Sequence, residues 1–195
     1  MTGSIFAIVL AAGLSRRFGQ ADKLMAPLHG QPLAAHIADT IASMDLAGRI
    51  AVCRTENDPL SALFRQRGFS VVANRDSMAG QSSSLRLGVA AAQEGGADAI
   101  LVCLADMPFV QGRHLSDLIG LGHTDLAASV SEDGGPPMPP AVFARHHFAA
   151  LAALSGDGGA RTMLWQAPTL SCPARDLRDF DEAADFDAIR NGPQL

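Results

Sequence analysis

The sequence lacks several features that would assign it to a particular class of protein. Its three cysteines, Cys53, Cys103 and Cys172, are scattered and include no CxxC pair, so we interpret them as small buried apolar residues in a reducing compartment. No run approaches the roughly 18 consecutive apolar residues that cross a membrane. No basic region precedes the first apolar segment, so a signal peptide is not expected and the cytoplasm is the default location.

An excess of positive charge is also missing. Fifteen lysines and arginines face 20 aspartates and glutamates, for a net charge of −5. This balance argues against a general nucleic-acid or lipid surface, although it leaves room for one basic pocket. Hydrophobic residues make up 48% of the 195 positions, which is typical of a globular chain. The length suits one domain over residues 1–195.

What the sequence does contain is an alternation of apolar runs and amphipathic helical patterns. Strands are predicted at Ile5–Leu10, Arg49–Arg54, Phe69–Ala73, Ala99–Leu104 and Leu126–Val130, and helices at 32–44, 59–67, 83–93 and 115–121. This order favours a Rossmann-like, three-layer α/β domain with a mainly parallel central sheet. After residue 130 the rhythm changes. A turn-rich loop is predicted at Glu132–Pro140, and helices at 145–154, 160–165 and 182–190.

The loop after the first strand combines glycine with positive charge. It reads Ala11-Ala12-Gly13-Leu14-Ser15-Arg16-Arg17-Phe18-Gly19, with Lys23 beyond it. Glycine lets backbone N–H groups approach phosphate oxygens, and the cations neutralise charge on them. The loop matches neither GxGxxG nor GxxxxGK[ST], which argues against a dehydrogenase or a P-loop ATPase. The alternative is a solvated basic loop between a strand and a helix.

Three further segments carry candidate functional groups. Asp106 lies just past a wholly apolar strand, where open α/β sheets bind ligands, and it could anchor Mg²⁺ or simply cap a loop. Gly80 and Ser82–Ser84 open a helix, where N–H groups and hydroxyls could hold a base or an anion, or could serve as ordinary caps. In the acidic tail, Asp181 could supply a second metal contact, whereas Asp176, Asp179 and Asp187 are interpreted as solvated.

Other candidates are weaker. His146 and His147 are adjacent, and adjacent positions of an α-helix point about 100° apart, which argues against a shared metal site. The segment Gly156–Arg161 could form a substrate loop or a plain link between helices. No order of serine, histidine and aspartate suggests a hydrolase.

Taken together, these motifs resemble the molybdenum cofactor nucleotidyltransferase family, within the larger group of sugar- and cofactor-nucleotidyltransferases. The resemblance covers nearly the whole chain and rests on LAAGLSRRFG followed by Lys23, then GQSSSLRLG, LADMP, PPAVFARHHF, GDGGAR and DFDEAADF. Of these, GQSSSLRLG, PAVF and GDGGAR point more narrowly to the cytidylyltransferases. The resemblance implies a fold of the nucleotide-diphospho-sugar transferase type, and the transfer of a cytidylyl group from CTP to the terminal phosphate of molybdopterin.

The resemblance also implies roles for individual residues. Arg16, Lys23 and Asp106 would be catalytic, and Asp106 and Asp181 would bind Mg²⁺. Nucleotide-binding positions would be Leu10, Ala11, Ala12, Gly13, Ser15, Arg16, Lys23, Gly80, Ser82, Ser83 and Ser84. Ala12 stands where guanylyl-transferring relatives commonly have glycine, which favours CTP over GTP. A recipient molybdoenzyme would be a partner, and neither nucleic acid nor membrane is expected.

Two departures from the family pattern affect these expectations. The family often shows GxPxxF where this chain has the proline-rich Met138–Phe143, which affects the shape of the cofactor pocket. In the tail, Glu182 and Ala183 replace Thr-Pro, which affects the second metal contact. Alternatives are a guanylyltransferase of the same family, a sugar-phosphate or isoprenoid-precursor nucleotidyltransferase, and a non-catalytic nucleotide-binding or cofactor-chaperone protein.

Overall fold

The computed structural model describes residues 3–13, 22–156, 160–182 and 184–186. Within these ranges a seven-stranded sheet runs in the order β5-β4-β1-β6-β8-β7-β9. Its strands are β1 (Ile5–Ala11), β4 (Gly48–Cys53), β5 (Ser70–Ala73), β6 (Ala99–Leu104), β7 (Leu126–Ser131), β8 (Met138–Ala144) and β9 (Thr169–Cys172). A small antiparallel ribbon joins β2 (Pro27–Leu28) to β3 (Gln31–Pro32). The predicted mainly parallel sheet is confirmed, because β5, β4, β1 and β6 are all parallel neighbours.

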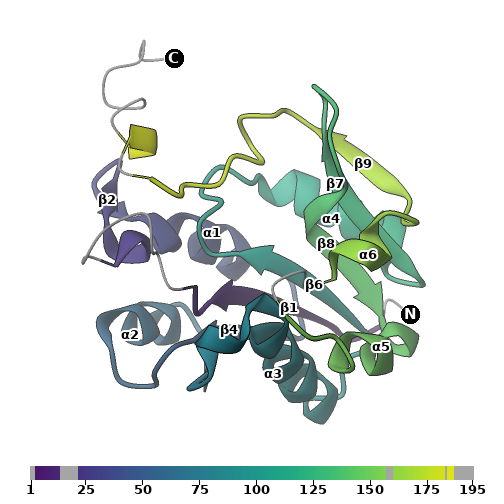
Figure 1. The fold of residues 1–195 in the computed structure, drawn as a ribbon, viewed down its shortest axis with the longest axis horizontal. Helices are drawn as coiled ribbons and strands as arrows, with labels where there is room; N and C mark the ends of the chain where they lie inside the picture. Colours follow the sequence, from purple (N-terminus) through teal and green to yellow (C-terminus); the bar gives the residue numbers. More distant parts are fainter. Residues whose placement is uncertain (1–2, 14–21, 157–159, 183, 187–195) are drawn as a thin grey trace.

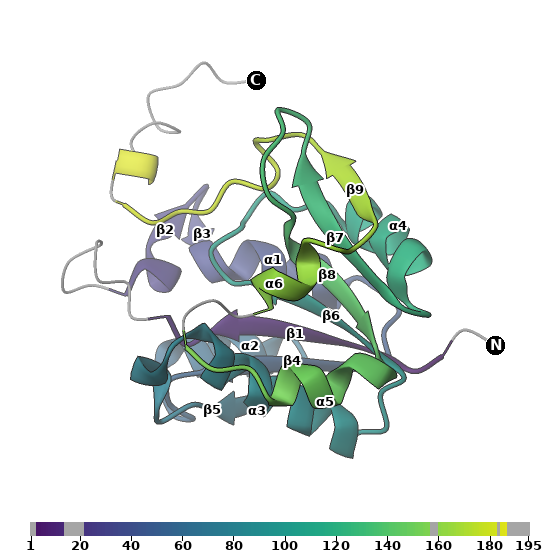
Figure 2. The same ribbon diagram turned by 45° about the vertical axis from the view of Figure 1, so that its right-hand side comes forward.

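Helices cover both faces of the sheet, as Figures 1 and 2 show. They are α1 (Leu33–Ala42), α2 (Pro59–Gln66), α3 (Gln81–Glu94), α4 (Gly112–Gly122), α5 (Phe148–Ala152) and α6 (Arg161–Leu164), with 3₁₀ turns η1 (Lys23–Met25), η2 (Ser77–Ala79) and η3 (Arg145–His147). Local chemistry sets the helix ends. In α2, Asp58 accepts a hydrogen bond from the Ser61 N–H, Pro59 starts the helix, and Gly68 follows it with a φ of +80°.

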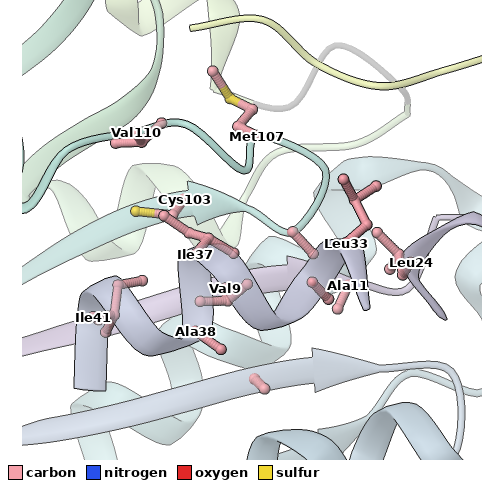
Figure 3. Packing of buried hydrophobic residues seen from close by; sticks show 14 of the residues in the cluster. Val9, Ala11, Leu24, Leu33, Ile37, Ala38, Ile41, Cys103, Met107 and Val110 are labelled. Carbon is pink, nitrogen blue, oxygen red and sulfur yellow. The ribbon is translucent and has the colours of Figure 1, made fainter. Parts of the chain in front are cut away.

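Alternating side chains of β1 belong to two separate hydrophobic cores, one on each face of the sheet. Val9 packs with α1, α2 and α4 on one face, and Ile8 packs with α3, α5 and α6 on the other. Figure 3 shows the first core, where Ile37 of α1 lies beside Val9 of β1 and Cys103 of β6. Burial on both faces explains why β1 and β6 have no polar break. The fold is therefore the expected three-layer α/β arrangement.

The prediction for residues after 130 is partly wrong. Met138–Pro140, predicted as part of a loop, begins β8, which lies antiparallel between β6 and β7. Pro139 and Pro140 fit because the β7–β8 register shifts beside them, so the ladder does not need their missing N–H groups. The helix predicted at 145–154 is shorter, consisting of η3 followed by α5. The strand β9 was not predicted, and most of the helix expected at 182–190 lies outside the described residues.

In the part of the chain that the structure describes, no helix is both long enough and apolar enough to span a membrane.

Because β1, β4, β5 and β6 run in the same direction, their carboxyl ends meet at one edge of the sheet. The Ala105 N–H donates to the Leu10 carbonyl oxygen at 3.1 Å, which holds the ends of β1 and β6 together at that edge.

Candidate active site

The carboxyl end of β1 leads into the predicted phosphate loop. Ala11 and Ala12 are buried, and Gly13 is exposed. Residues 14–21 are not described, so the predicted roles of Ser15 and Arg16 lie outside the described residues. The chain is described again at Asp22, directly before Lys23.

Asp22 positions Lys23 by two hydrogen bonds. One of its carboxylate oxygens accepts from the Leu24 N–H at 3.1 Å and caps η1. The other accepts from the Arg54 guanidinium at 2.6 Å. Since Arg54 directly follows β4, this ion pair ties the start of η1 to the sheet edge. Leu24 is buried in the core next to Ala11 and Leu33 (Figure 3), so Lys23 is held on a fixed turn.

The Lys23 amine lies between two carboxylates from distant parts of the chain. Its Nζ donates to Asp106 Oδ2 and to Asp181 Oδ1, at 2.7 Å in each case. The exposed fraction of the side chain is 8% for Lys23, 20% for Asp106 and 46% for Asp181. The arrangement is a largely buried cation held between a partly buried carboxylate and a half-exposed one.

Backbone contacts explain why Asp181 reaches this position. The Phe180 N–H donates to the Asp106 carbonyl oxygen at 3.0 Å, and the fully buried Phe180 ring packs against Phe109 and Phe186. Asp185 then accepts hydrogen bonds from the Asp181 and Glu182 N–H groups, at 2.9 and 2.8 Å. The tail is therefore anchored on both sides of Asp181.

The neighbouring carboxylates change the pKa values of Lys23 and Asp179. Burial of the Lys23 amine works to lower its pKa, but the charges and hydrogen bonds of Asp106 and Asp181 outweigh burial and raise the pKa above its ordinary value. Asp179 is exposed, and its pKa is raised because its carboxyl is partly desolvated and lies near the charges of Asp181 and Asp106. This exposure agrees with the interpretation of Asp179 as a solvated carboxylate.

One carboxylate oxygen of Asp106 is suited to bind a metal ion. Among the residues that the structure describes, Asp106 Oδ1 is buried and has no hydrogen-bond partner. An unpaired buried carboxylate oxygen is costly unless a ligand completes it. A hard divalent cation such as Mg²⁺ binds carboxylate oxygens together with phosphate oxygens. The donor set of Asp106 and Asp181 fits such an ion.

The predicted serine cluster lies at the amino end of α3, after β5. Gly80 precedes the helix with a φ of 91°, a conformation that favours glycine. Ser82, Ser83 and Ser84 are all buried. The Ser82 hydroxyl donates to the Gly156 carbonyl oxygen at 2.6 Å, which places the start of the glycine-rich segment 156–161 beside α3.

The other two serines belong to a buried network around Asn74, which the sequence analysis missed. The Asn74 amide donates to the hydroxyl oxygens of Ser83 and Ser84, at 2.8 Å each, and the Ser83 hydroxyl donates to the Gly80 carbonyl oxygen at 2.7 Å. These bonds shape the amino end of α3, and the role of the serines in base recognition stays a prediction. Asn74 directly follows β5, and a polar residue in that position of the sequence could have been recognised as a candidate.

The same signal could have found Arg54, at the end of β4. Arg54 also lines a groove of about 210 Å³ along the carboxyl ends of β4 and β5, together with Thr55, Glu56, Asn57, Ala73 and Arg75. The groove therefore adjoins the turn that carries Lys23.

The structure agrees with the interpretation of the cysteines and corrects that of the histidines. Cys53, Cys103 and Cys172 are buried and free, and burial raises the pKa of the Cys53 thiol to about 11. His146 and His147 lie in a 3₁₀ turn, η3, and not in an α-helix. Both rings reach the same carboxylate oxygen of Asp125, so the expectation that they point apart is wrong.

Comparison with known proteins identifies the family. Residues 7–170 match the model of the MobA-like NTP transferase domain. The purine catabolism protein PucB of Bacillus subtilis is 33% identical over 94% of this chain and 91% of its own length. A molybdenum cofactor guanylyltransferase of Shewanella frigidimarina is 28% identical over 83% of this chain and 79% of its own length.

Solved structures agree with these matches. The Rv0371c protein of Mycobacterium tuberculosis H37Rv, in complex with manganese, is 25% identical and has a TM-score of 0.78 over 95% of this chain and 97% of that one. More distant synthases, at 12% and 13% identity, match with TM-scores of 0.72 and confirm the nucleotide-diphospho-sugar transferase type of fold. The family match covers most of the first strand, the Lys23 turn and Asp106. The chain is a nucleotidyltransferase that belongs to the MobA-like NTP transferase family.

Proposed function

We propose that this chain transfers the cytidylyl group of CTP to the terminal phosphate of molybdopterin and releases pyrophosphate, with residues 1–195 acting as one domain. The observation that carries the proposal is the Lys23 amine at the carboxyl end of β1, held at 2.7 Å from both Asp106 and Asp181. The family supplies the NTP substrate. The choice of CTP and of molybdopterin rests on the sequence motifs.

In the proposed reaction an oxygen of the acceptor phosphate forms a bond to the α-phosphorus of CTP. The bond from that phosphorus to the bridging oxygen breaks, and pyrophosphate leaves with the electron pair. The acceptor phosphate is already ionised near neutral pH, so no general base is required. Lowering the barrier is then a matter of orientation and charge neutralisation.

Lys23 is suited to neutralise the leaving pyrophosphate. Its raised pKa keeps the amine charged at neutral pH, and its fixed turn removes most of the entropy cost of placing it. The N–H groups near Ala12 and Gly13 would approach the triphosphate, and Arg16 and Ser15 would complete the phosphate loop. The amine would exchange its carboxylate partners for phosphate oxygens as the nucleotide binds.

Asp106 and Asp181 are the residues that would hold Mg²⁺. The ion would supply charge neutralisation and alignment of the phosphate oxygens when bound. The unpaired Asp106 Oδ1 supports this role, and so does the manganese in the structure of the Mycobacterium tuberculosis relative. Asp106 offers the better fixed carboxylate, because its strand is central and its side chain is less exposed than that of Asp181.

A guanylyltransferase is the second candidate, because the Shewanella frigidimarina relative carries that name. The two candidates differ in the base that the site accepts. Ala12 favours CTP in this chain, since the guanylyl-transferring pattern commonly has glycine there. A recipient molybdoenzyme is part of either proposal.

The test is a pyrophosphate-release assay with Mg²⁺, run with each nucleoside triphosphate, with and without molybdopterin. We expect release that requires both CTP and molybdopterin, with Asp106→Ala as the inactive control. Release with GTP in place of CTP would establish the second candidate. Tight binding of CTP with no release under any condition would contradict both and would favour a non-catalytic binding protein.

A further inference from the structure

Three potential metal ligands meet near the amino end of β6, whereas Lys23 lies near its carboxyl end. They are Asp125, which directly precedes β7, and His146 and His147 in η3, which follows β8. The Nε2 atoms of His146 and His147 lie 3.0 and 2.7 Å from the same oxygen, Asp125 Oδ1. One ligand atom from each of the three side chains lies within 4.8 Å of the other two. The ring centroids of the two histidines are 4.1 Å apart.

Backbone hydrogen bonds hold these three side chains in place. The Ala144 N–H donates to the Asp125 carbonyl oxygen at 2.7 Å, which joins the end of β8 to the residue before β7. The Arg145 N–H donates to the Asp98 carbonyl oxygen at 2.7 Å, and the Arg145 guanidinium donates to the Ala97 carbonyl oxygen at 2.8 Å. The cluster is therefore mounted on paired strand ends and not on a free loop.

The two histidines do not diverge, because a 3₁₀ turn replaces the expected α-helix. The His147 ring also packs edge-on against Phe143, with 6.5 Å between ring centroids, and only 21% of the His147 side chain is exposed. The side chains of His146 and Asp125 are 59% and 68% exposed. One ligand is thus fixed by packing, and the other two can adjust.

The cluster is distant from the candidate active site. In β6, Ala99 pairs with Ala144, next to η3, whereas Asp106 follows the other end of the same strand. At about 3.3 Å per residue, the two ends of this segment are on the order of 20 Å apart. Binding at one cluster can therefore be measured separately from binding at the other.

The donor set indicates the kind of ion. Two imidazole nitrogens and one carboxylate oxygen suit first-row transition ions such as Zn²⁺, whereas Mg²⁺ and Ca²⁺ require mainly oxygen ligands. In a tetrahedral zinc site with bonds of about 2.0–2.1 Å, neighbouring ligand atoms lie about 3.3 Å apart. Each Nε2 atom needs to separate from Asp125 Oδ1 by only a few tenths of an ångström. The exposed His146 and Asp125 can make that movement.

We propose that Asp125, His146 and His147 form a Zn²⁺ site, with water in the remaining position and with the ion joining the start of β7 to the end of β8. Each histidine binds the ion through Nε2, in the tautomer that carries the ring proton on Nδ1. This site is independent of the proposed function, because none of its ligands belongs to the candidate active site.

The test uses the untagged chain in excess Mg²⁺, which occupies the oxygen ligands of the active site. Zn²⁺ binding is followed by calorimetry, and Co²⁺ is titrated as a second probe because its visible absorption reports imidazole ligation. We expect one equivalent of each ion. The thermal midpoint should rise with Zn²⁺ concentration, since the ion binds only the folded state.

Three conservative variants, Asp125→Asn, His146→Gln and His147→Gln, should each weaken binding about tenfold or more. His123→Gln is the matched control, because this half-buried histidine lies two residues from Asp125 but bonds to the Ile119 carbonyl oxygen. It should bind Zn²⁺ like the original chain. Circular dichroism checks that each variant is folded. No stoichiometric binding, or equal binding by folded variants of all three ligands, would overturn the proposal.

Discussion

Two polar clusters lie at opposite ends of the strands of the same sheet, and they differ in their exposure to water. At the carboxyl edge, the Lys23 side chain is 8% exposed, and its amine pairs with Asp106 and Asp181. At the amino edge, His146 and His147 share an Asp125 carboxylate that is 68% exposed. The first cluster contains a buried cation, and the second pairs two imidazole rings with an exposed carboxylate. Burial at the first makes each charge difficult to remove, whereas water at the second replaces a lost partner at little cost.

The largest effect is expected from the buried cluster. Asp106→Ala and Lys23→Ala should each lower turnover at least about a hundredfold, because losing one fixed charge stabiliser raises the barrier by about 2.7–4 kcal/mol. Steady-state pyrophosphate release by the folded variants measures this. Full activity of Asp106→Ala would remove Asp106 from the metal site and would make the two clusters functionally alike.

Asp181 should matter less than Asp106. Its side chain is 46% exposed, and it comes from the tail and not from the end of a central strand. We expect Asp181→Asn to lower turnover about tenfold, which corresponds to about 1.4 kcal/mol, and to raise the Mg²⁺ concentration needed for half-maximal activity. The measurement is kcat across a Mg²⁺ titration, with Asp39→Asn as a control in an exposed ion pair far along the sequence. A loss as large as that of Asp106→Ala would show that exposure does not rank these two carboxylates.

Sequence patterns predicted the parallel half of the sheet well, and physical reasons explain where they failed. Apolar runs such as β1 and β6 are unambiguous, because both faces of these strands are buried. In β8, Pro139 and Pro140 signalled a loop, yet a register shift in the partner strand accommodates them. The short edge strand β9 is only four residues long and too weakly patterned to detect.

The candidate site shows the same division. Lys23 and Asp106 were predictable as residues at strand ends, which parallel pairing brings to one edge. The residues alone left the role of Asp181 open, and the resemblance to the family supplied it. Its position depends on Phe180 packing against Phe109 and on the hydrogen bond from the Phe180 N–H to the Asp106 carbonyl oxygen. Asp22 as a partner of Arg54 and the convergence of His146 and His147 depend on tertiary geometry that spacing along the chain does not encode.

The free energy of unfolding should also distinguish the buried Lys23 cluster from an exposed ion pair. Lys23→Met leaves Asp106 without its cation, and we expect the free energy of unfolding to fall by about 2–3 kcal/mol, less than for a fully buried pair because Asp181 keeps contact with water. Arg67→Met, which breaks the more exposed pair with Asp39, should cost about 0–1 kcal/mol. Urea unfolding measures both. Equal costs would show that burial does not strengthen the Lys23 pairs.

The pH dependence of that difference has a definite sign. The pKa of Lys23 is raised in the folded chain, so its stabilising contribution is complete below the unfolded value of about 10.4 and is lost as the pH rises through the folded value. The gap in unfolding free energy between the original chain and Lys23→Met should stay constant from about pH 6 to 9 and shrink above about pH 10.4. A gap that shrank near neutral pH would mean that Lys23 is not the group that titrates.

The smallest effect is expected at the exposed cluster when no metal is present. The His147 and His146 hydrogen bonds lower the pKa of Asp125, so the stabilisation that they provide is present above the unfolded pKa of about 3.9 and is lost as the pH falls through the folded value. Water surrounds this carboxylate and competes for the same bonds. Asp125→Asn in a chelator should therefore leave both the urea midpoint at pH 7 and the turnover unchanged within error. A clear loss of stability would mean that the cluster supports the β7–β8 junction without an ion, and the contrast with the Lys23 cluster would then rest on catalysis alone.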